Sequence, residues 1–199
     1  MPGRGRTIAV LSATLGLVTL AAAAILFQDA LRENIHKLET GSLEEKIAAA
    51  RRLGELGSAR AAPALIEAFR VLCVEGEGAE FRGVFQDALL RMGKPALPAL
   101  VRAVPWAVSM TRVNFIQQRG PDGEGELDFH RFANAYSFYS IIHETIEANY
   151  LGKTPPQLSL RIDARDLTDL RRILESLRDD ALASRELRQA AAESLKAFP

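Results

Sequence analysis

An internal repeat is the feature that most constrains the fold of this chain. The stretch LGELGSARAAPALIEAF, residues 53–69, aligns with LLRMGKPALPALVRAV, residues 89–104, at an offset of 36 residues that falls to 35 after one deletion. A period of this length is typical of helical-hairpin repeats. One hairpin cannot bury its own apolar face, so the sequence predicts that the units stack on one another.

Glycine and proline occupy equivalent positions in the two copies. Gly57 aligns with Gly93, and Pro63 aligns with Pro98. Glycine suits the left-handed backbone conformation that ends many helices, and proline is tolerated in a first helical turn because the N–H group there has no helical partner. Each copy therefore predicts a first helix, a stop at glycine and a second helix with proline near its start.

A partial third copy closes the chain, where AAAESLKAF, residues 190–198, matches AAARRLGEL, residues 48–56. The pattern A-x-x-L-G-x-x-G followed by A-x-P-A-L-I-E-A-L resembles the HEAT-like repeats of phycobilisome lyase subunits and of many unrelated bacterial proteins. The resemblance covers residues 43–104 well and the last fifteen residues in part. It implies an all-α fold, a short α-solenoid that mostly binds other proteins, and it transfers neither catalytic residues nor bilin attachment.

The N-terminus carries the second strong signal. Residues 7–27, TIAVLSATLGLVTLAAAAILF, contain no charge over 21 positions, which is long enough to cross about 30 Å of hydrocarbon as a helix. The competing interpretation is a signal peptide, with Arg4 and Arg6 as its basic region and cleavage near Ala24. Because no glycine or proline interrupts the chain between these alanines and Gly41, the sequence favours one unbroken helix that leaves the membrane.

Charge sets the predicted orientation and the class of partner. Lysine and arginine near a membrane span tend to stay cytoplasmic, so we expect an inner-membrane protein with a cytoplasmic N-terminus and an extracytoplasmic main domain. Signal cleavage would instead give a secreted or periplasmic protein. Twenty-five basic residues balance 25 acidic ones, which argues against nucleic acid as a partner. Cys73 is the single cysteine, so the sequence predicts no intrachain disulfide and no Cys-based zinc site. We also expect no cofactor.

These observations divide the chain into six predicted parts. They are a cytoplasmic n-region (1–6), a transmembrane helix or signal peptide (7–27), a juxtamembrane helix (28–41), two HEAT-like repeats (42–105), an inserted segment with an acidic loop and an aromatic helix (106–157), and C-terminal helices with a partial repeat (158–199).

In the acidic loop GPDGEGELDFHRF, residues 120–132, the spacing of acidic residues and glycine resembles that of an EF-hand calcium loop. With Gly125 at loop position 6, the candidate metal ligands are Asp122, Glu124 and Asp128. Gly120 then removes the first carboxylate, and Arg131 replaces the bidentate ligand with a cation. A solvated glycine-rich turn is the alternative, and an ion-responsive binding module remains the alternative function.

An aromatic stripe follows the loop. Its members recur at steps of three and four, which predicts one face of a helix: Phe129, Phe132, Tyr136, Tyr139, His143, Ile146 and Tyr150. The stripe is either the core of a helix that packs across the solenoid or a surface for a partner. On the second interpretation the candidate partner-binding residues are Trp106, Tyr136, Tyr139 and Tyr150.

No recognisable catalytic motif accompanies these features. His143, Glu144 and Glu147 stand in the order HETIE, which is not the HExxH zinc pattern. We therefore predict a membrane-anchored protein–protein interaction module, an adaptor or accessory subunit of a membrane assembly without catalysis of its own. Its predicted partner is another, membrane-associated protein. A small hydrolase or lyase centred on His143 is the rival from the enzyme class.

Overall fold

The helices of this chain follow the predicted repeat. The computed structural model describes the backbone of residues 4–75, 78–117, 129–152 and 164–198, with side chains described for 21–75, 81–109, 138–152 and 167–198. The elements are α1 (Arg4–Thr40), α2 (Leu43–Leu56), η1 (Ala59–Ala61), α3 (Ala62–Glu75), α4 (Gly78–Met92), η2 (Lys94–Ala96), α5 (Leu97–Gln117), α6 (Phe129–Leu151), α7 (Ala164–Asp179) and α8 (Arg185–Leu195). Every element within the described ranges is helical, which confirms the all-α class.

The two hairpins have the same order of parts. α2 and α4 are each followed by a glycine with positive φ, +61° at Gly57 and +63° at Gly93. A short 3-10 turn, η1 or η2, leads from each glycine into the second helix. Pro63 and Pro98 are the second residues of α3 and α5, where the missing N–H costs nothing. The predicted stops at glycine and starts near proline are therefore confirmed. Of the two glycines, Gly57 adopts the left-handed helical conformation, whereas Gly93 has ψ −148° and does not.

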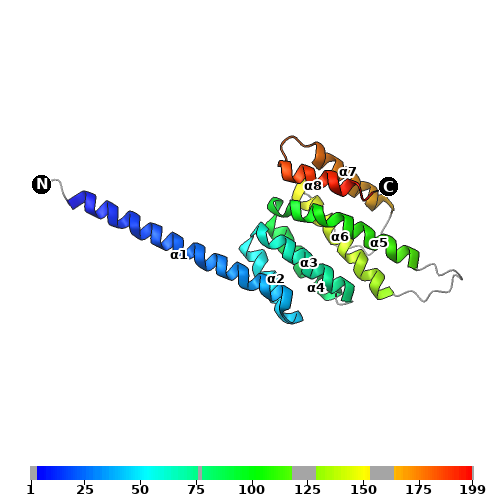
Figure 1. Cartoon of the computed structure of the whole chain (residues 1–199), viewed down its shortest axis with the longest axis horizontal. Helices are drawn as coiled ribbons and strands as arrows, with labels where there is room; N and C mark the ends of the chain where they lie inside the picture. Colours follow the sequence, from blue (N-terminus) through cyan, green and yellow to red (C-terminus); the bar gives the residue numbers. More distant parts are fainter. Residues whose placement is uncertain (1–3, 76–77, 118–128, 153–163, 199) are drawn as a thin grey trace.

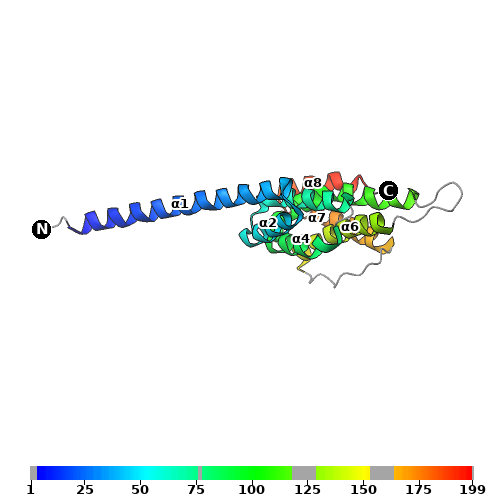
Figure 2. The same ribbon diagram turned by 90° about the horizontal axis from the view of Figure 1, so that it is seen from below.

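The hairpins stack into two layers (Figures 1 and 2). One layer contains the C-terminal part of α1 followed by α3, α5 and α8, each of which contacts the next. The other contains α2, α4 and α6, and α6 also packs across α3 and α5. α7 pairs with α8 as the last hairpin. Figure 2 shows α1 and α8 along one edge of the molecule, with α2, α4 and α6 beneath them.

The core lies between these layers. The leucines aligned by the repeat are fully buried: Leu53, Leu65, Leu89 and Leu100. Phe69 stacks on Phe85 and on Phe138, with ring centroids 5.4 and 5.6 Å apart. Such aromatic pairs contribute about 0.5–1.5 kcal/mol each beyond the apolar area that they bury. In its described part, the aromatic face of α6 is thus core that fills the space beneath the repeats.

α1 is one continuous helix of 37 residues that projects well beyond the stack (Figure 1). Leu31 and Leu38 bury its C-terminal part against the repeats, as the predicted helix over 28–41 requires. Further out, Ile25 and Leu26 are 61% and 69% exposed. In the part of the chain that the structure describes, no helix is both long and apolar enough to cross a membrane. The predicted span 7–27 falls mostly outside the described side chains and stays a prediction.

The predicted boundary after residue 105 falls inside α5, which continues through Pro105 to Gln117. A proline in a helix removes the N–H that would bond the carbonyl four residues earlier, here that of Val101. The Ser194 hydroxyl of α8 donates to this carbonyl oxygen at 2.7 Å, and Ser194 is itself buried. The third hairpin thus supplies the donor that Pro105 lacks, and α5 remains a helix.

α8 differs from α2, with which the partial third copy aligns it, in its place within the hairpin. The alignment matched residues 190–198 with 48–56 in α2, the first helix of a hairpin. In the structure α8 is the second helix of the last hairpin and lies against α5. Its small residues Ala190 and Ala191 are buried, and Ala190 lines the groove against α5.

Replacing Ser194 tests the role of its hydroxyl. We expect Ser194→Ala to lower the free energy of unfolding by about 1–3 kcal/mol, because the buried carbonyl of Val101 then has no donor. Urea unfolding followed by circular dichroism measures the change. In a Pro105→Ala background the restored N–H should reduce the cost of Ser194→Ala by about 1 kcal/mol. Equal costs in the two backgrounds would show that the bond does not compensate for the proline.

Gly54 tests the close approach of α2 to α4. A Cβ atom at this position would lie 2.8 Å from the backbone Cα of Ala88, so one helix must move to accept it. We expect Gly54→Ala to destabilise the fold by about 1–3 kcal/mol, although alanine is the better helix former by about 1 kcal/mol. The control is Gly83→Ala in α4, where a Cβ meets nothing within 4 Å and stability should rise or stay unchanged.

Candidate functional site

A pocket of about 330 Å³ opens between α3 and α5, the second helices of the two repeats. Its lining consists of Pro63, Ile66, Glu67, Arg70, Ala99, Arg102, Ala103, Trp106 and Phe138. Ala99 and Ala103 stand four residues apart on one face of α5, and their small side chains leave the space between the helices unfilled. The two copies of the repeat thus create a hollow at the seam where they meet.

Trp106 is held in place on two sides. Its ring meets Phe138 of α6 edge to face, with centroids 4.6 Å apart and planes at 86°. The guanidinium of Arg70 lies 5.1 Å from its centroid, a cation–π contact between α3 and α5. Trp106 is only half-buried, so its fixed ring still faces the pocket.

Arg70 is fixed in turn by Glu67, one turn earlier on α3. Its Nε donates to Glu67 Oε2 at 2.7 Å, and a second guanidinium nitrogen donates to Glu67 Oε1. These hydrogen bonds raise the pKa of Arg70 and lower the pKa of the Glu67 carboxyl. The pair therefore stays charged across the physiological range, with the cation directed over the tryptophan.

Arg102 stands between this pocket and a second groove of about 350 Å³ between α5 and α8. It donates to Glu186 of α8, which places its guanidinium at the rim of both hollows. Glu67 occupies a similar position on the other side, because it also lines a smaller hollow of about 210 Å³ between α1 and α3. Three neighbouring hollows therefore follow one another across the layer that α1, α3, α5 and α8 form.

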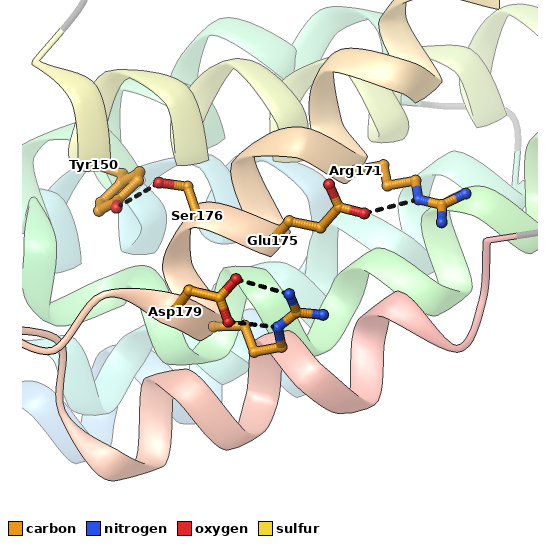
Figure 3. A network of polar contacts seen from close by, with 6 residues as sticks. Tyr150, Arg171, Glu175, Ser176 and Asp179 are labelled. Carbon is orange, nitrogen blue, oxygen red and sulfur yellow. Dashed lines mark hydrogen bonds and ion pairs between the residues drawn. The ribbon is translucent and has the colours of Figure 1, made fainter.

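The other predicted partner-binding residues lie elsewhere. Tyr139 is 1% exposed and belongs to the core, while the side chain of Tyr136 lies outside the described residues. Tyr150 is half-buried, and its hydroxyl lies 3.1 Å from Ser176 Oγ of α7 (Figure 3). Tyr150 thus joins α6 to α7, beside exposed ion pairs on α7 such as Arg171 with Glu175.

The candidate metal ligands Asp122, Glu124 and Asp128 lie outside the described residues, so the ion-site prediction stays untested. Within the ranges that the structure describes, no group of three or more His, Cys, Asp or Glu side chains is arranged to hold a metal ion.

The candidate catalytic residues are on α6, within the packed face rather than at the Trp106 pocket. The ring of His143 lies 5.9 Å from that of Tyr139, and it is half-buried. Glu144 accepts a hydrogen bond from the Gln86 amide of α4 at 2.8 Å. Asn149, five residues further along α6, donates to the carbonyls of Leu89 and Gly93. Glu144 and Asn149 therefore connect α6 to α4 through hydrogen bonds.

Trp106, a predicted partner-binding residue, lies at this pocket, but sequence reasoning did not predict the residues around it. The spacing of Arg102 and Trp106 placed both on one helical face, and Glu67 and Arg70 share a face in the same way. The sequence does not show which residues surround Trp106, because a repeat does not indicate which faces of α3 and α5 contact each other.

Comparisons with protein-family models, with curated proteins and with solved structures found no match. The HEAT-like assignment therefore rests on the repeat in the sequence and stays a prediction.

Cys73, the single cysteine, gives a prediction about pH. It is buried in α3, and burial raises the pKa of its thiol to about 12, from an ordinary value of 9.0. Above pH 9 the unfolded thiol loses its proton while the folded one keeps it, so the folded state loses stability as the pH rises. Between pH 9 and about 12 we expect this thiol to contribute a loss approaching 1.4 kcal/mol per pH unit.

The measurement compares the wild type with Cys73→Ala in urea at several pH values. The difference in stability between the two proteins should be constant below pH 9 and should shrink above it. A difference that is independent of pH up to 11 would contradict a deeply buried thiol.

Proposed function

We propose that this chain is a membrane-anchored adaptor: the N-terminal part of α1 inserts into the inner membrane, and the helical stack binds another protein without catalysis of its own. The observation that carries the proposal is the course of α1, which runs without a break from Arg4 into the stack. The apolar segment and the part of α1 that packs in the folded stack therefore belong to one helix.

The exposed residues of α1 support the anchor. Ile25, Leu26 and Phe27 are consecutive and 61%, 69% and 37% exposed, at the point where the helix leaves the stack. Exposing these three side chains to water costs about 25 cal/mol for each Å² of apolar surface. The preceding segment 7–20 is also uncharged, so a hydrocarbon environment would cover both.

The Trp106 pocket supports the binding half. Tryptophan and arginine are the residues most enriched at the energetic centres of protein interfaces, and here they contact each other at the edge of an apolar hollow. The HEAT-like resemblance adds to this, because such repeats mostly present surfaces to other proteins.

The proposed orientation follows the charges that flank the apolar segment. Arg4 and Arg6 stay on the cytoplasmic side, and the stack lies outside the cytoplasm. The alternative within this proposal is that the chain is cleaved near Ala24. Cleavage would release the same binding stack as a periplasmic or secreted protein.

Two arginines in the apolar segment test the anchor. We expect full-length protein in the membrane fraction after carbonate extraction, and Leu17→Arg/Val18→Arg protein in the soluble fraction. The reason is that each arginine costs about 2.5–3.5 kcal/mol near the centre of a membrane helix. Leu182→Arg is the control, because Leu182 is 98% exposed on the stack. The intact mass of the wild-type protein in the membrane and soluble fractions distinguishes an anchor from a cleaved signal.

Site-specific photo-crosslinking in intact membranes tests the binding half. A photoreactive residue at Ala103, in the pocket, should give a discrete adduct, whereas one at Val84, between α2 and α4, should not. Wild-type protein that is entirely soluble would contradict the anchor. Identical adduct patterns from the two positions would contradict a binding surface on this face.

A further inference from the structure

We infer that the stack rests on the membrane through one edge, and that Leu182 at this edge enters the interface between lipid headgroups and acyl chains. The edge consists of four segments that each end a helix, residues 57–61, 93–96, 151–152 and 180–184, and we call them the turn edge. The inference rests on the anchor in the proposed function and goes beyond it, because a membrane helix can hold its domain at any height above the bilayer. The contact orients the stack and adds to an attachment that α1 already provides.

α1 sets the height of the stack above the proposed span. The uncharged segment 7–27 ends at Phe27, and the next residue, Gln28, already contacts the stack. Its side-chain carbonyl accepts a hydrogen bond of 3.3 Å from Nη1 of Arg60, which belongs to η1. No spacer therefore separates the proposed span from the stack, and a bilayer that holds residues 7–27 has the turn edge at its surface.

The turn edge lies on the side of the stack from which α1 projects (Figure 1). The helices α2, α4, α6 and α7 all run toward this side, so their last residues fall there. The C-terminal ends of α1, α3 and α5 lie at the opposite edge (Figure 1). A bilayer that α1 crosses therefore faces the turn edge and is remote from the other one.

Leu182 provides the apolar contact at this edge. Its side chain is 98% exposed, and hydrogen bonds hold its turn in place. The carboxylate of Asp180 accepts from the Leu182 N–H at 2.8 Å and from the hydroxyl of Tyr150 at 3.5 Å. Leu151, which is 46% exposed, lies at the same edge at the end of α6. The stack therefore holds leucine side chains in water at the edge that faces the proposed bilayer, where an apolar environment would cover them.

The charges of the turn edge suit lipid headgroups. Arg60 and Lys94 are exposed and form no ion pair with the residues that the structure describes, so both are available to lipid phosphates. Asp180, the carboxylate of the same edge, already accepts two hydrogen bonds within the stack. Beside Gln28 on α1, the exposed Asp29 and Arg32 offset each other in charge. The edge therefore presents basic groups to phosphate, while its own carboxylate is engaged internally.

The shape of the turn edge favours a bilayer over a protein as its occupant. None of the four segments contributes a residue to the three hollows between α1, α3, α5 and α8. Protein partners bind most strongly through side chains that fill pockets, whereas a lipid surface accepts apolar side chains with basic residues beside them. The turn edge and the Trp106 pocket are thus separate surfaces with different occupants.

The experiment measures the depth of residue 182 in a bilayer. Full-length Leu182→Cys protein is labelled with the fluorophore NBD and reconstituted into vesicles of phosphatidylethanolamine and phosphatidylglycerol, with a lipid that carries a nitroxide quencher high on its acyl chain. Interfacial side chains lie about 5–10 Å into the boundary between headgroups and chains, so we expect the label to lose about half of its emission. Cys73 is 1% exposed, so unmodified protein should take up little label.

Val74→Cys is the matched control. Val74 is also an exposed apolar residue, at 51%, but it lies in the last turn of α3, about 18 Å further along this helix than Ala62. That end of α3 belongs to the far edge of the stack (Figure 1). The nitroxide lipid should leave the emission of this label unchanged. Circular dichroism confirms that both variants fold, and flotation confirms that both are attached to the vesicles.

Flotation and quenching separate this inference from the proposed function. Protein that floats with the vesicles while its label at 182 is not quenched would overturn the inference and leave the anchor in place. Equal quenching at positions 182 and 74 would also overturn it, because the turn edge would then have no special contact. Protein that does not float would contradict the anchor and the inference together. An unquenched label at 182 that crosslinks to another protein in native membranes would assign the edge to a protein partner.

Discussion

The helix α5 depends on a hydrogen bond that comes from outside it. Pro105 lacks the N–H that the Val101 carbonyl requires, and Ser194 of α8 supplies a hydroxyl in its place. Arg102 and Trp106 lie on either side of this proline, so both belong to one pocket only if the helix passes through it unbroken. The last hairpin thus keeps the central helix continuous as well as closing the stack.

Much of this architecture follows from local sequence. A glycine that must adopt positive φ and a proline that fits only a first turn are strong signals, and they placed the ends of α2 and α4 and the starts of α3 and α5. The aromatic spacing on α6 identified one helical face, and the burial of Phe138 and Tyr139 shows that this face is core in its described part.

Features with a distant cause could not be predicted from local sequence. Pro105 lies inside a helix, and the residue that compensates for it lies 93 positions from the carbonyl it serves. The alignment of residues 190–198 with 48–56 likewise does not indicate the layer in which a helix lies, because small residues suit a close helix contact in either layer. Trp106 was proposed from its residue type. Its pocket, however, forms where α3 and α5 pack side by side, and no local sequence pattern predicts that contact.

The length of α1 has a mechanical consequence. A helix of 37 residues is about 55 Å long, and it enters the stack without a flexible joint. Were α1 a flexible tether, the stack could take many positions relative to the N-terminal end of this helix. As one stiff helix, α1 holds the Trp106 pocket at a set distance from that end, so a membrane that holds the end, as proposed, would also set the height of the pocket above it.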